Sequence, residues 1–257
     1  MGMLESIQSG RENRPPRIMI YGSEGVGKST FGAGAPDPVF IQTEDGLGEI
    51  DCRRFPAAKS LSDVLSQLTA LRDEPHEFRT VAVDSLDWLE RPIFDAVCRE
   101  YGVRSIEKAD GGYGRGYTHA LTHWNRIIAL LEELHGRRGM LVVLIAHAKV
   151  ERFEDPESAA YDRYTPRLNK HAASLIAEWA DAVLFATRRF RVQKENSGFA
   201  ERGIAAPVGA DGGERILRTI GSPACVAKNR YGLPGEIPLS WSAFVAALQK
   251  AKEETRG

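Results

Sequence analysis

The sequence predicts an α/β fold built around a mostly parallel central sheet, and three observations indicate it. Short apolar runs without polar alternation, such as residues 17–21 and 139–146, are typical of strands buried on both faces. Stretches with apolar residues at helical spacing separate these runs. A glycine-rich stretch joins the first predicted strand to the first predicted helix. Because strands alternate with helices, we expect helices on both faces of the sheet.

The composition is that of one large domain. The chain has 257 residues, 42% of them hydrophobic, and a formal net charge of −1, so it can form a full core and has no overall basic excess. We expect a flexible leader at residues 1–16, a main domain at residues 17–240, and a C-terminal helix and tail at residues 241–257. The sequence has neither the pattern of a secretory signal nor a membrane span, so we expect a cytoplasmic protein.

The expected elements follow from apolar patterning. Strands are predicted at residues 17–21, 38–42, 78–84, 139–146, 182–187, 215–220 and 224–227, the last ones forming an antiparallel edge after a hairpin-like region that ends near residue 213. Helices are predicted at residues 28–34, 61–71, 86–97, 121–134, 172–179 and 241–251. We expect Ser60 or Ser62 to cap the second helix, Pro92 to start a turn or bend the third, and Gly136 to end the fourth. Residues 102–118 and 148–168 are expected to be long loops.

The stretch between the first strand and the first helix has the spacing of a phosphate-binding loop. It matches the pattern of Gly, four residues, and Gly-Lys-Ser/Thr. Glycines let successive backbone N–H groups point inward and form a nest for an anion such as the triphosphate of ATP. The alternative is a glycine turn before an ordinary helix. The predicted nucleotide-binding residues are Gly22, Ser23, Glu24, Gly25, Val26, Gly27, Lys28, Ser29 and Thr30.

Within this stretch, Lys28 would reach the β- and γ-phosphates, and the Ser29 hydroxyl would ligate Mg²⁺. Asp84 ends a Val-Ala-Val strand, where a carboxylate beside the loop holds the metal, usually through water. The alternative for Asp84 is a cap at the start of the next helix. Together the three residues predict a Mg-ATP site.

A catalytic carboxylate must come from elsewhere, because the residue after Asp84 is Ser85. Glu44 follows the second strand at the edge where open parallel sheets bind ligands, and it could polarise the attacking water. The alternative for Glu44 is a solvated acidic turn. His147 ends another strand at this edge and could contact the γ-phosphate, although a single histidine is often structural.

These parts together resemble the RecA-like branch of P-loop ATPases. The resemblance rests on residues 22–30, Glu44, Val81 to Ser85 and the strand ending at His147, and it covers about residues 15–235. Within this branch, the sequence is most similar to compact phage single-strand annealing proteins of the Sak type. One departure is His147, where RecA has a glutamine. The resemblance implies a RecA-like core that assembles head to tail as a homo-oligomer and hydrolyses Mg-ATP slowly, stimulated by assembly or DNA.

The resemblance also implies roles for basic residues. Lys228 and Arg230 resemble the paired cations that RecA-like rings insert into the neighbouring subunit's nucleotide site; alternatively, they are a basic strand end. Relatives bind single-stranded DNA through loops, for which residues 102–118 and 148–167 are the candidates, since cations follow phosphates and tyrosines stack on bases. These stretches also carry acidic residues, as ordinary soluble loops do. A single-strand-binding protein is a further candidate partner in annealing or recombination.

Two other functions stay open from the sequence. One is an ATP-dependent assembly switch or protein-binding module with little hydrolysis. The other is a small-molecule kinase, although the chain has no obvious arginine-rich lid.

Overall fold

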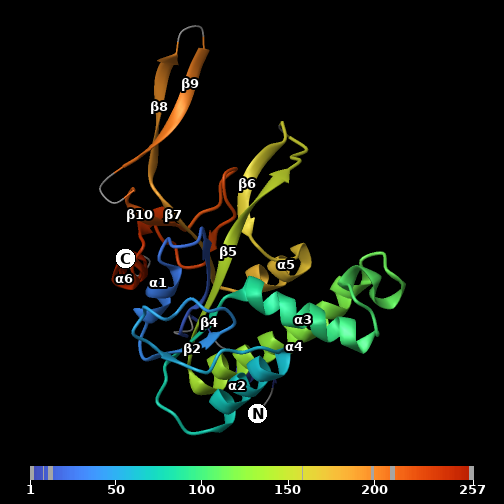
Figure 1. Ribbon diagram of the computed structural model, residues 1–257. Helices are drawn as coiled ribbons and strands as arrows, with labels where there is room; N and C mark the ends of the chain where they lie inside the picture. Colours follow the sequence, from blue (N-terminus) through green and yellow to red (C-terminus); the bar gives the residue numbers. More distant parts are fainter. Residues whose placement is uncertain are drawn as a thin grey trace.

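The computed structural model describes residues 3–7, 9–10, 14–157, 159–197, 200–208 and 212–254. Within this part of the chain, ten strands form one sheet whose main path is β12-β10-β7-β1-β5-β4-β2-β3 (Figure 1). Its parallel strands are β1 (Arg17–Gly22), β2 (Pro38–Gln42), β3 (Arg53–Arg54), β4 (Thr80–Asp84), β5 (Leu141–Phe153) and β7 (Ala182–Arg188). Near the C-terminus, β10 (Arg215–Arg218), β11 (Lys228–Asn229) and β12 (Glu236–Pro238) pair antiparallel. The predicted fold class is therefore confirmed.

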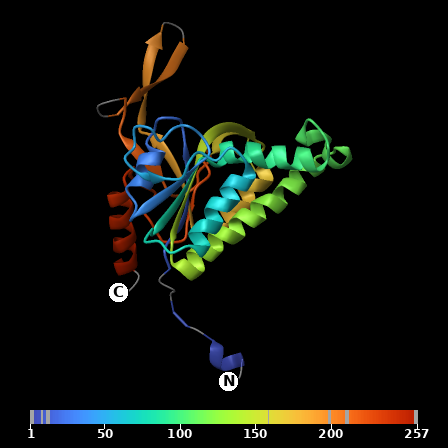
Figure 2. The ribbon, with the colours of Figure 1, turned by 60° about the horizontal axis from the view of Figure 1, so that its bottom comes forward.

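Helices cover both faces of the sheet (Figure 2). One face carries α2 (Leu61–Asp73), α3 (Leu86–Glu100), α4 (Arg115–Arg138) and α5 (Lys170–Trp179), and the other carries α1 (Lys28–Ala33) and α6 (Trp241–Glu254). In β1, Met19 and Tyr21 join the first of these cores, while Ile18 and Ile20 join the second. This explains the continuous apolar runs, because each strand residue is buried on one face or the other.

The N-terminal leader contains the short 3-10 helix η1 (Met3–Ser6), whose residues are all exposed. Figure 2 shows η1 away from the sheet. The flexibility of the leader and the domain boundaries stay predictions. Among the described helices, none is both long enough and apolar enough to cross a membrane.

Three helix ends differ from the expectations. Ser60, and not Ser62, caps α2: its hydroxyl accepts the Asp63 backbone N–H, and the Asp63 carboxylate accepts the Ser60 N–H, a capping box. The helix α3 continues through Pro92 to Glu100, so the proline does not interrupt it. The helix α4 passes Gly136 and ends before Gly139, which has the left-handed backbone (φ 64°) that suits a glycine at this position.

The predicted loop at residues 102–118 is partly helical. It contains η2 (Ile106–Gly111) and the first turn of α4. Gly116 in that turn lies so close to the Ile106 backbone that an added Cβ would be 2.0 Å from the Ile106 carbonyl oxygen. The sequence pattern missed the start of α4 because four glycines at residues 111–116 suggested a loop, whereas the last of them, Gly116, serves helix packing.

The predicted loop at residues 148–168 is mostly a β-hairpin. Strand β5 continues beyond the sheet to Phe153 and pairs antiparallel with β6 (Tyr161–Pro166). The hairpin-like region contains β8 (Phe190–Ser197) and β9 (Ala200–Pro207), paired antiparallel. We call residues 148–166 the β5–β6 arm, which projects to the right of the β8–β9 hairpin in the upper part of Figure 1. The strand expected at residues 224–227 is wrong, since β11 begins only at Lys228.

Candidate functional site

The sequence-predicted site residues meet at the carboxyl ends of the parallel strands. In the strand register, Gly22 lies opposite His147, and Asp84 lies opposite Ile145 and Gln42. The glycine loop, Asp84, His147 and the segment after β2 therefore share one edge of the sheet. This is the edge at which open parallel sheets bind ligands.

Glycine is required in the loop for two different reasons. Gly25 and Gly27 have φ angles of 69° and 111°, a backbone conformation that other residues rarely adopt. Gly22 has an ordinary φ, but an added Cβ would lie 2.2 Å from the carbonyl oxygen of Ala186 in β7. The loop thus leaves the sheet in close contact with the neighbouring strand and then turns in a way that only glycine allows readily.

The Lys28 side chain folds back onto the loop. Its ammonium group donates to the backbone carbonyls of Gly22 at 3.1 Å and Ser23 at 2.8 Å. The side chain is buried, and this burial lowers the pKa of Lys28 although nearby Asp84 and Glu44 favour its charged form. An ammonium group held across the mouth of a glycine loop is suited to bind an anion that enters the loop.

Ser29 and Asp84 form a direct pair. The Ser29 hydroxyl donates to the Asp84 carboxylate at 2.6 Å. Burial raises the pKa of Asp84, while the hydrogen bond from Ser29 and the charge of Lys28 act in the opposite direction. Asp84 does not cap α3, because the cap position is Ser85. One hydroxyl and one carboxylate oxygen side by side fit Mg²⁺, which prefers oxygen ligands and keeps several waters.

Glu44 is held at the same edge by the residue before it. The Thr43 backbone N–H donates to the Asp84 carbonyl at 2.8 Å, and the Thr43 hydroxyl donates to the Ser85 carbonyl at 2.6 Å. A Glu44 carboxylate oxygen lies 3.9 Å from His147 Nε2. Burial raises the pKa of Glu44 above its ordinary value. Glu44 is thus a partly buried carboxylate close to Asp84, and not a solvated turn residue.

Asp87, in the first turn of α3, is a buried residue of this site that the sequence analysis missed. Its carboxylate accepts from the backbone N–H of His147 at 3.0 Å and from His147 Nδ1 at 3.1 Å. It also accepts from the Arg167 guanidinium at 2.7 Å. Burial opposes the charge of Asp87, but these hydrogen bonds outweigh it and hold the pKa of Asp87 well below its usual range. The available signal was an acidic residue in the first turn after the strand that ends at Asp84.

Arg167, which the sequence analysis placed in a candidate DNA-binding stretch, contacts two residues of the site. Besides Asp87, its guanidinium lies 3.6 Å from the carboxylate of Glu24 in the glycine loop. His147, at the start of the β5–β6 arm, and Arg167, just after its end, both contact Asp87. The arm is thus anchored beside the glycine loop at both of its ends.

Lys228 and Arg230 lie at the opposite end of the sheet from the glycine loop. Lys228 is paired with Val183, near the amino end of β7. Its ammonium group donates to the Ala177 carbonyl at the end of α5, while Arg230 contacts Asp181 at 3.2 Å and the Glu178 carbonyl at 3.2 Å. Neither cation can reach the glycine loop of its own chain, so the structure does not bring them together with the other predicted residues.

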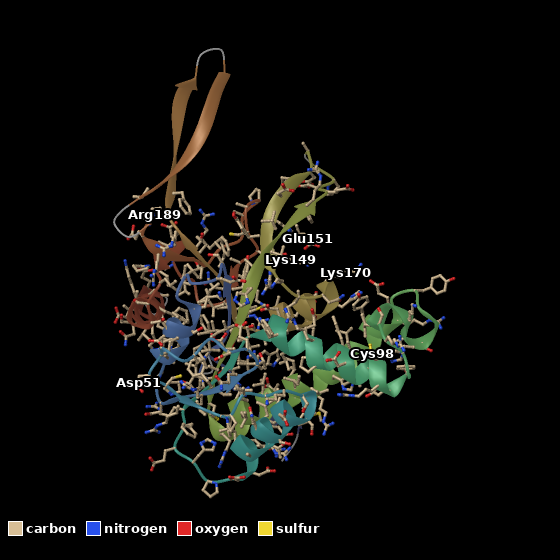
Figure 3. All side chains as sticks on the ribbon, viewed as in Figure 1. Asp51, Cys98, Lys149, Glu151, Lys170 and Arg189 are labelled. Carbon is tan, nitrogen blue, oxygen red and sulfur yellow. The ribbon has the colours of Figure 1, made fainter. Side chains whose placement is uncertain are left out.

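The two segments predicted to bind DNA differ in exposure. At the tip between α3 and α4, Arg104, Lys108, Tyr113 and Arg115 are exposed, as are the acidic Glu107 and Asp110, and Tyr113 is 99% exposed. In the β5–β6 arm, Lys149 donates to the Leu168 carbonyl at 3.1 Å, and Arg163 lies over the Phe153 ring at 3.8 Å. Figure 3 labels Lys149 and Glu151 in this arm, away from the α3–α4 tip that extends beyond Cys98.

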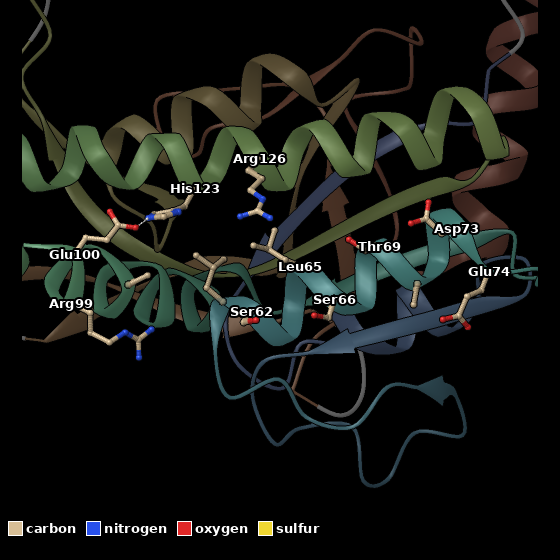
Figure 4. Close-up of a pocket in the computed structure, with 13 residues that line it drawn as sticks. Ser62, Leu65, Ser66, Thr69, Asp73, Glu74, Arg99, Glu100, His123 and Arg126 are labelled. Atoms are coloured by element: carbon tan, nitrogen blue, oxygen red, sulfur yellow. Dashed lines mark ion pairs between the residues drawn. The ribbon is translucent and has the colours of Figure 1, made fainter.

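One hollow among the described residues lies away from the glycine loop. A groove of about 570 Å³ lies between α2, α3 and α4, where His123 and Glu100 form an ion pair at 3.2 Å (Figure 4). It contains no residue of the glycine loop and none of the predicted site residues.

A glycine loop with a buried lysine and an adjoining hydroxyl–carboxylate pair defines a P-loop site. A family model described as an AAA domain matches residues 14–231, which is most of the chain, so the protein belongs to this family. The SPbeta prophage-derived uncharacterized protein YorG of Bacillus subtilis (strain 168) is 28% identical over 172 residues, which is 65% of this chain and 49% of YorG. The match therefore spans about half of that relative.

Among solved structures, the RadB recombinase superimposes with a TM-score of 0.47 at 11% identity. That superposition covers 90% of each chain. The relation to Sak-type annealing proteins stays a prediction.

Proposed function

We propose that the protein binds Mg-ATP in the glycine loop and hydrolyses it slowly. The observation that carries this proposal is the convergence of Lys28, Ser29 and Asp84 on one loop, with the Ser29–Asp84 pair at 2.6 Å. Lys28 would bind the β- and γ-phosphates, and Ser29 with Asp84 would hold Mg²⁺. The metal would supply charge neutralisation at the phosphates.

In this proposal Glu44 is the general base that orients and polarises the attacking water. Its partial burial and raised pKa suit a proton acceptor better than a fully solvated carboxylate would. His147 lies between Glu44 and Asp87, so it can respond to the terminal phosphate and hold the β5–β6 arm at the same time.

We further propose head-to-tail assembly in which Lys228 and Arg230 act on the neighbouring subunit's nucleotide. Their place at the far end of the sheet supports this, because a head-to-tail contact joins opposite ends of two copies. Cations from the neighbour would neutralise charge that develops on the γ-phosphate, so turnover would depend on assembly.

Single-stranded DNA is the proposed macromolecular ligand, for annealing or recombination of a phage type in the cytoplasm of a bacterial host. The prophage-derived relative supports the phage setting. Exposed Tyr113 with three nearby cations supports the α3–α4 tip as the contact, because stacking and phosphate neutralisation require accessible groups. Residues 102–118 have three basic and two acidic residues, whereas residues 148–167 have four basic and five acidic ones, which favours the arm as a connection to the site. The single-strand-binding partner stays a prediction.

The second candidate is an ATP-dependent assembly switch with little hydrolysis. It is favoured by the Asp87–His147–Arg167 contacts, which join the site to a projecting arm and could transmit nucleotide binding without turnover. Turnover measured with and without single-stranded DNA separates the two: release of phosphate that rises with DNA supports the ATPase, and stable binding of ATP without release supports the switch.

Titration calorimetry with Mg-ATP tests the nucleotide site itself. The wild type and the exposed-lysine control Lys250→Ala are expected to bind, whereas Lys28→Ala is expected to lose binding by a factor of about 100 or more, since it removes a charge-assisted contact to phosphate. Binding by Lys28→Ala at the level of the control would overturn the assignment.

A further inference from the structure

A second hollow lies directly against the glycine loop, on the side of α1 that faces away from the α2–α5 layer. It measures about 380 Å³ and lies between α1, β10 and the first turn of α6. Its walls include Gly27 and Thr30 from the loop and α1, together with Leu239 and Trp241 at the start of α6. Figure 1 shows α1 and α6 side by side at this position, and Phe31 of α1 lies 5.2 Å from the Trp241 ring.

The direction of a bound triphosphate follows from the residues already placed. Ser29, Asp84 and Glu44 mark the end where Mg²⁺ and the terminal phosphate would lie, and none of them lines the hollow. The loop N–H groups cradle the α- and β-phosphates, so the α-phosphate leaves the loop at its other end. Gly27 and Thr30 line the hollow, so the rest of a nucleotide that leaves the loop there would continue into it.

The walls of the hollow suit a flat aromatic group. Trp241 is held in place by edge-on contact with Phe31 at 5.2 Å and tilted contact with Phe244 at 5.5 Å, yet it is only half-buried and lines the hollow. Leu239 adds an aliphatic wall. Small-molecule sites are typically about 300–1,000 Å³, mostly apolar, with few polar groups, and this hollow fits that description.

The residues that line the hollow with polar side chains are Thr30, Arg215, Ser240 and Ser242. The Arg215 guanidinium is exposed beside the loop, with Nη1 3.3 Å from the position of a Cβ added to Gly27. The Ser240 hydroxyl already accepts the Ala243 N–H at 3.1 Å as the cap of α6. Among the described residues, no carboxylate lines the hollow, so these residues offer no acceptor pair for the donor edge of a guanine.

From these observations we propose that this hollow is the nucleoside subsite, in which the base of a purine nucleotide lies against Trp241 and Leu239. The proposal rests on the triphosphate site proposed above. It assigns a ligand-binding role to the C-terminal helix, which the sequence analysis had placed outside the main domain. Base contact here is apolar, so we expect ATP and GTP to bind with similar affinity.

Comparing Mg-ATP with inorganic tripolyphosphate and Mg²⁺ tests the subsite separately from the phosphate loop. Tripolyphosphate can occupy the loop but has no base. In the wild type we expect ATP to bind at least about tenfold more tightly, since stacking of one base on an aromatic side chain contributes about that much or more. In Trp241→Ala and in Leu239→Ala, ATP affinity should fall toward that of tripolyphosphate, while tripolyphosphate affinity stays at the wild-type value.

The tripolyphosphate measurement also reports that the variants are folded, and Trp179→Ala is the matched control. Trp179 is likewise half-buried but lies at the opposite end of the sheet, so its ATP-to-tripolyphosphate ratio should match the wild type. If both Trp241→Ala and Leu239→Ala keep the wild-type ratio, or if wild-type ATP binds no better than tripolyphosphate, the subsite is wrong while the phosphate site stands. If neither ligand binds to the wild type, the proposed function itself fails and the subsite with it.

Discussion

Two buried carboxylates of α3, those of Asp87 and Glu90, have different hydrogen-bond partners, and their pKa values are shifted in opposite directions. Asp87 has hydrogen bonds from His147 and a guanidinium, so it stays charged. Glu90, one turn further along α3, accepts only the Asn169 backbone N–H, at 3.0 Å, among the hydrogen bonds seen in the described residues. Burial therefore dominates and raises the pKa of Glu90 to about 7.

The raised pKa of Glu90 predicts a pH-dependent stability. Between about pH 4.5 and pH 7 the folded protein keeps a proton on Glu90 that the unfolded chain releases, so the free energy of unfolding falls as pH rises through this window, by roughly 3 kcal/mol. Glu90→Gln cannot titrate and should lack this fall. Urea unfolding at several pH values should show the variant gaining stability relative to wild type up to pH 7. The exposed control Glu253→Gln should follow the wild type, and a constant difference between Glu90→Gln and wild type would contradict the assignment.

The proposed role of Glu44 as general base predicts that a substitution can remove ATP turnover without removing Mg-ATP binding. Glu44→Gln keeps the size of the side chain but cannot accept a proton, so Mg-ATP affinity should stay within about threefold of wild type while phosphate release falls about 100-fold or more. Asp45→Asn is the matched control, because Asp45 is the exposed acidic neighbour. Steady-state phosphate release and calorimetry measure the two quantities. Equal turnover in the two variants would remove Glu44 from the chemistry.

At the scale of elements, the helix α2 offers a test of local structure that is independent of function. Ser60 forms the capping box, whereas Ser62, two residues later, is exposed. Ser60→Ala should lower the free energy of unfolding by about 1 kcal/mol, since it leaves the Asp63 N–H without its partner. Ser62→Ala should change it by less than about 0.5 kcal/mol. Chemical denaturation of both variants checks this, and equal stabilities would contradict the cap.

Local patterns predicted the parallel strands β1, β2, β4, β5 and β7 and the glycine loop because these depend on short-range features. A strand buried on both faces is continuously apolar, as at residues 139–146, and the loop needs glycine at Gly22, Gly25 and Gly27. The polar pairing of β5 with β6 was missed because the arm projects from the core and so lacks apolar alternation.

Long-range contacts explain the other differences. The site role of Asp87 depends on His147 and Arg167, which are distant in sequence and come together only through the strand order. The hollow beside α1 depends in the same way on α6 packing against α1, which is distant in sequence. No local pattern of the sequence indicates the contacts of Asp87 or the packing of α6 on α1. The Ser29–Asp84 pair, in contrast, was predicted because each residue belongs to a known strand-and-loop motif.

At the scale of the whole molecule, the proposal that Lys228 and Arg230 act across an interface predicts complementation. Arg230→Ala leaves the glycine loop intact, and Lys28→Ala leaves the cations intact. Each variant alone should have little turnover, but a mixture should regain part of it, because some interfaces then pair an intact loop with an intact Arg230. Phosphate release from the mixture over a range of ratios is the measurement.

The control for complementation is Arg189→Ala, which removes a partly exposed arginine with ion pairs to Glu214 and Glu236. This variant should keep turnover by itself. If Arg230→Ala alone is fully active, the cation has only its structural contacts to Asp181 and Glu178. If both variants are inactive and the mixture is inactive as well, the neighbour does not supply Arg230.

The most direct measurement for the account as a whole is a crystal structure with Mg²⁺ and a non-hydrolysable ATP analogue. We expect the phosphates inside the loop from Gly22 to Thr30, the ammonium group of Lys28 on the β- and γ-phosphates, and the metal on the Ser29 hydroxyl with Asp84 beside it. A nucleotide bound elsewhere, with Lys28 still on the Gly22 and Ser23 carbonyls and Ser29 still on Asp84, would contradict the account.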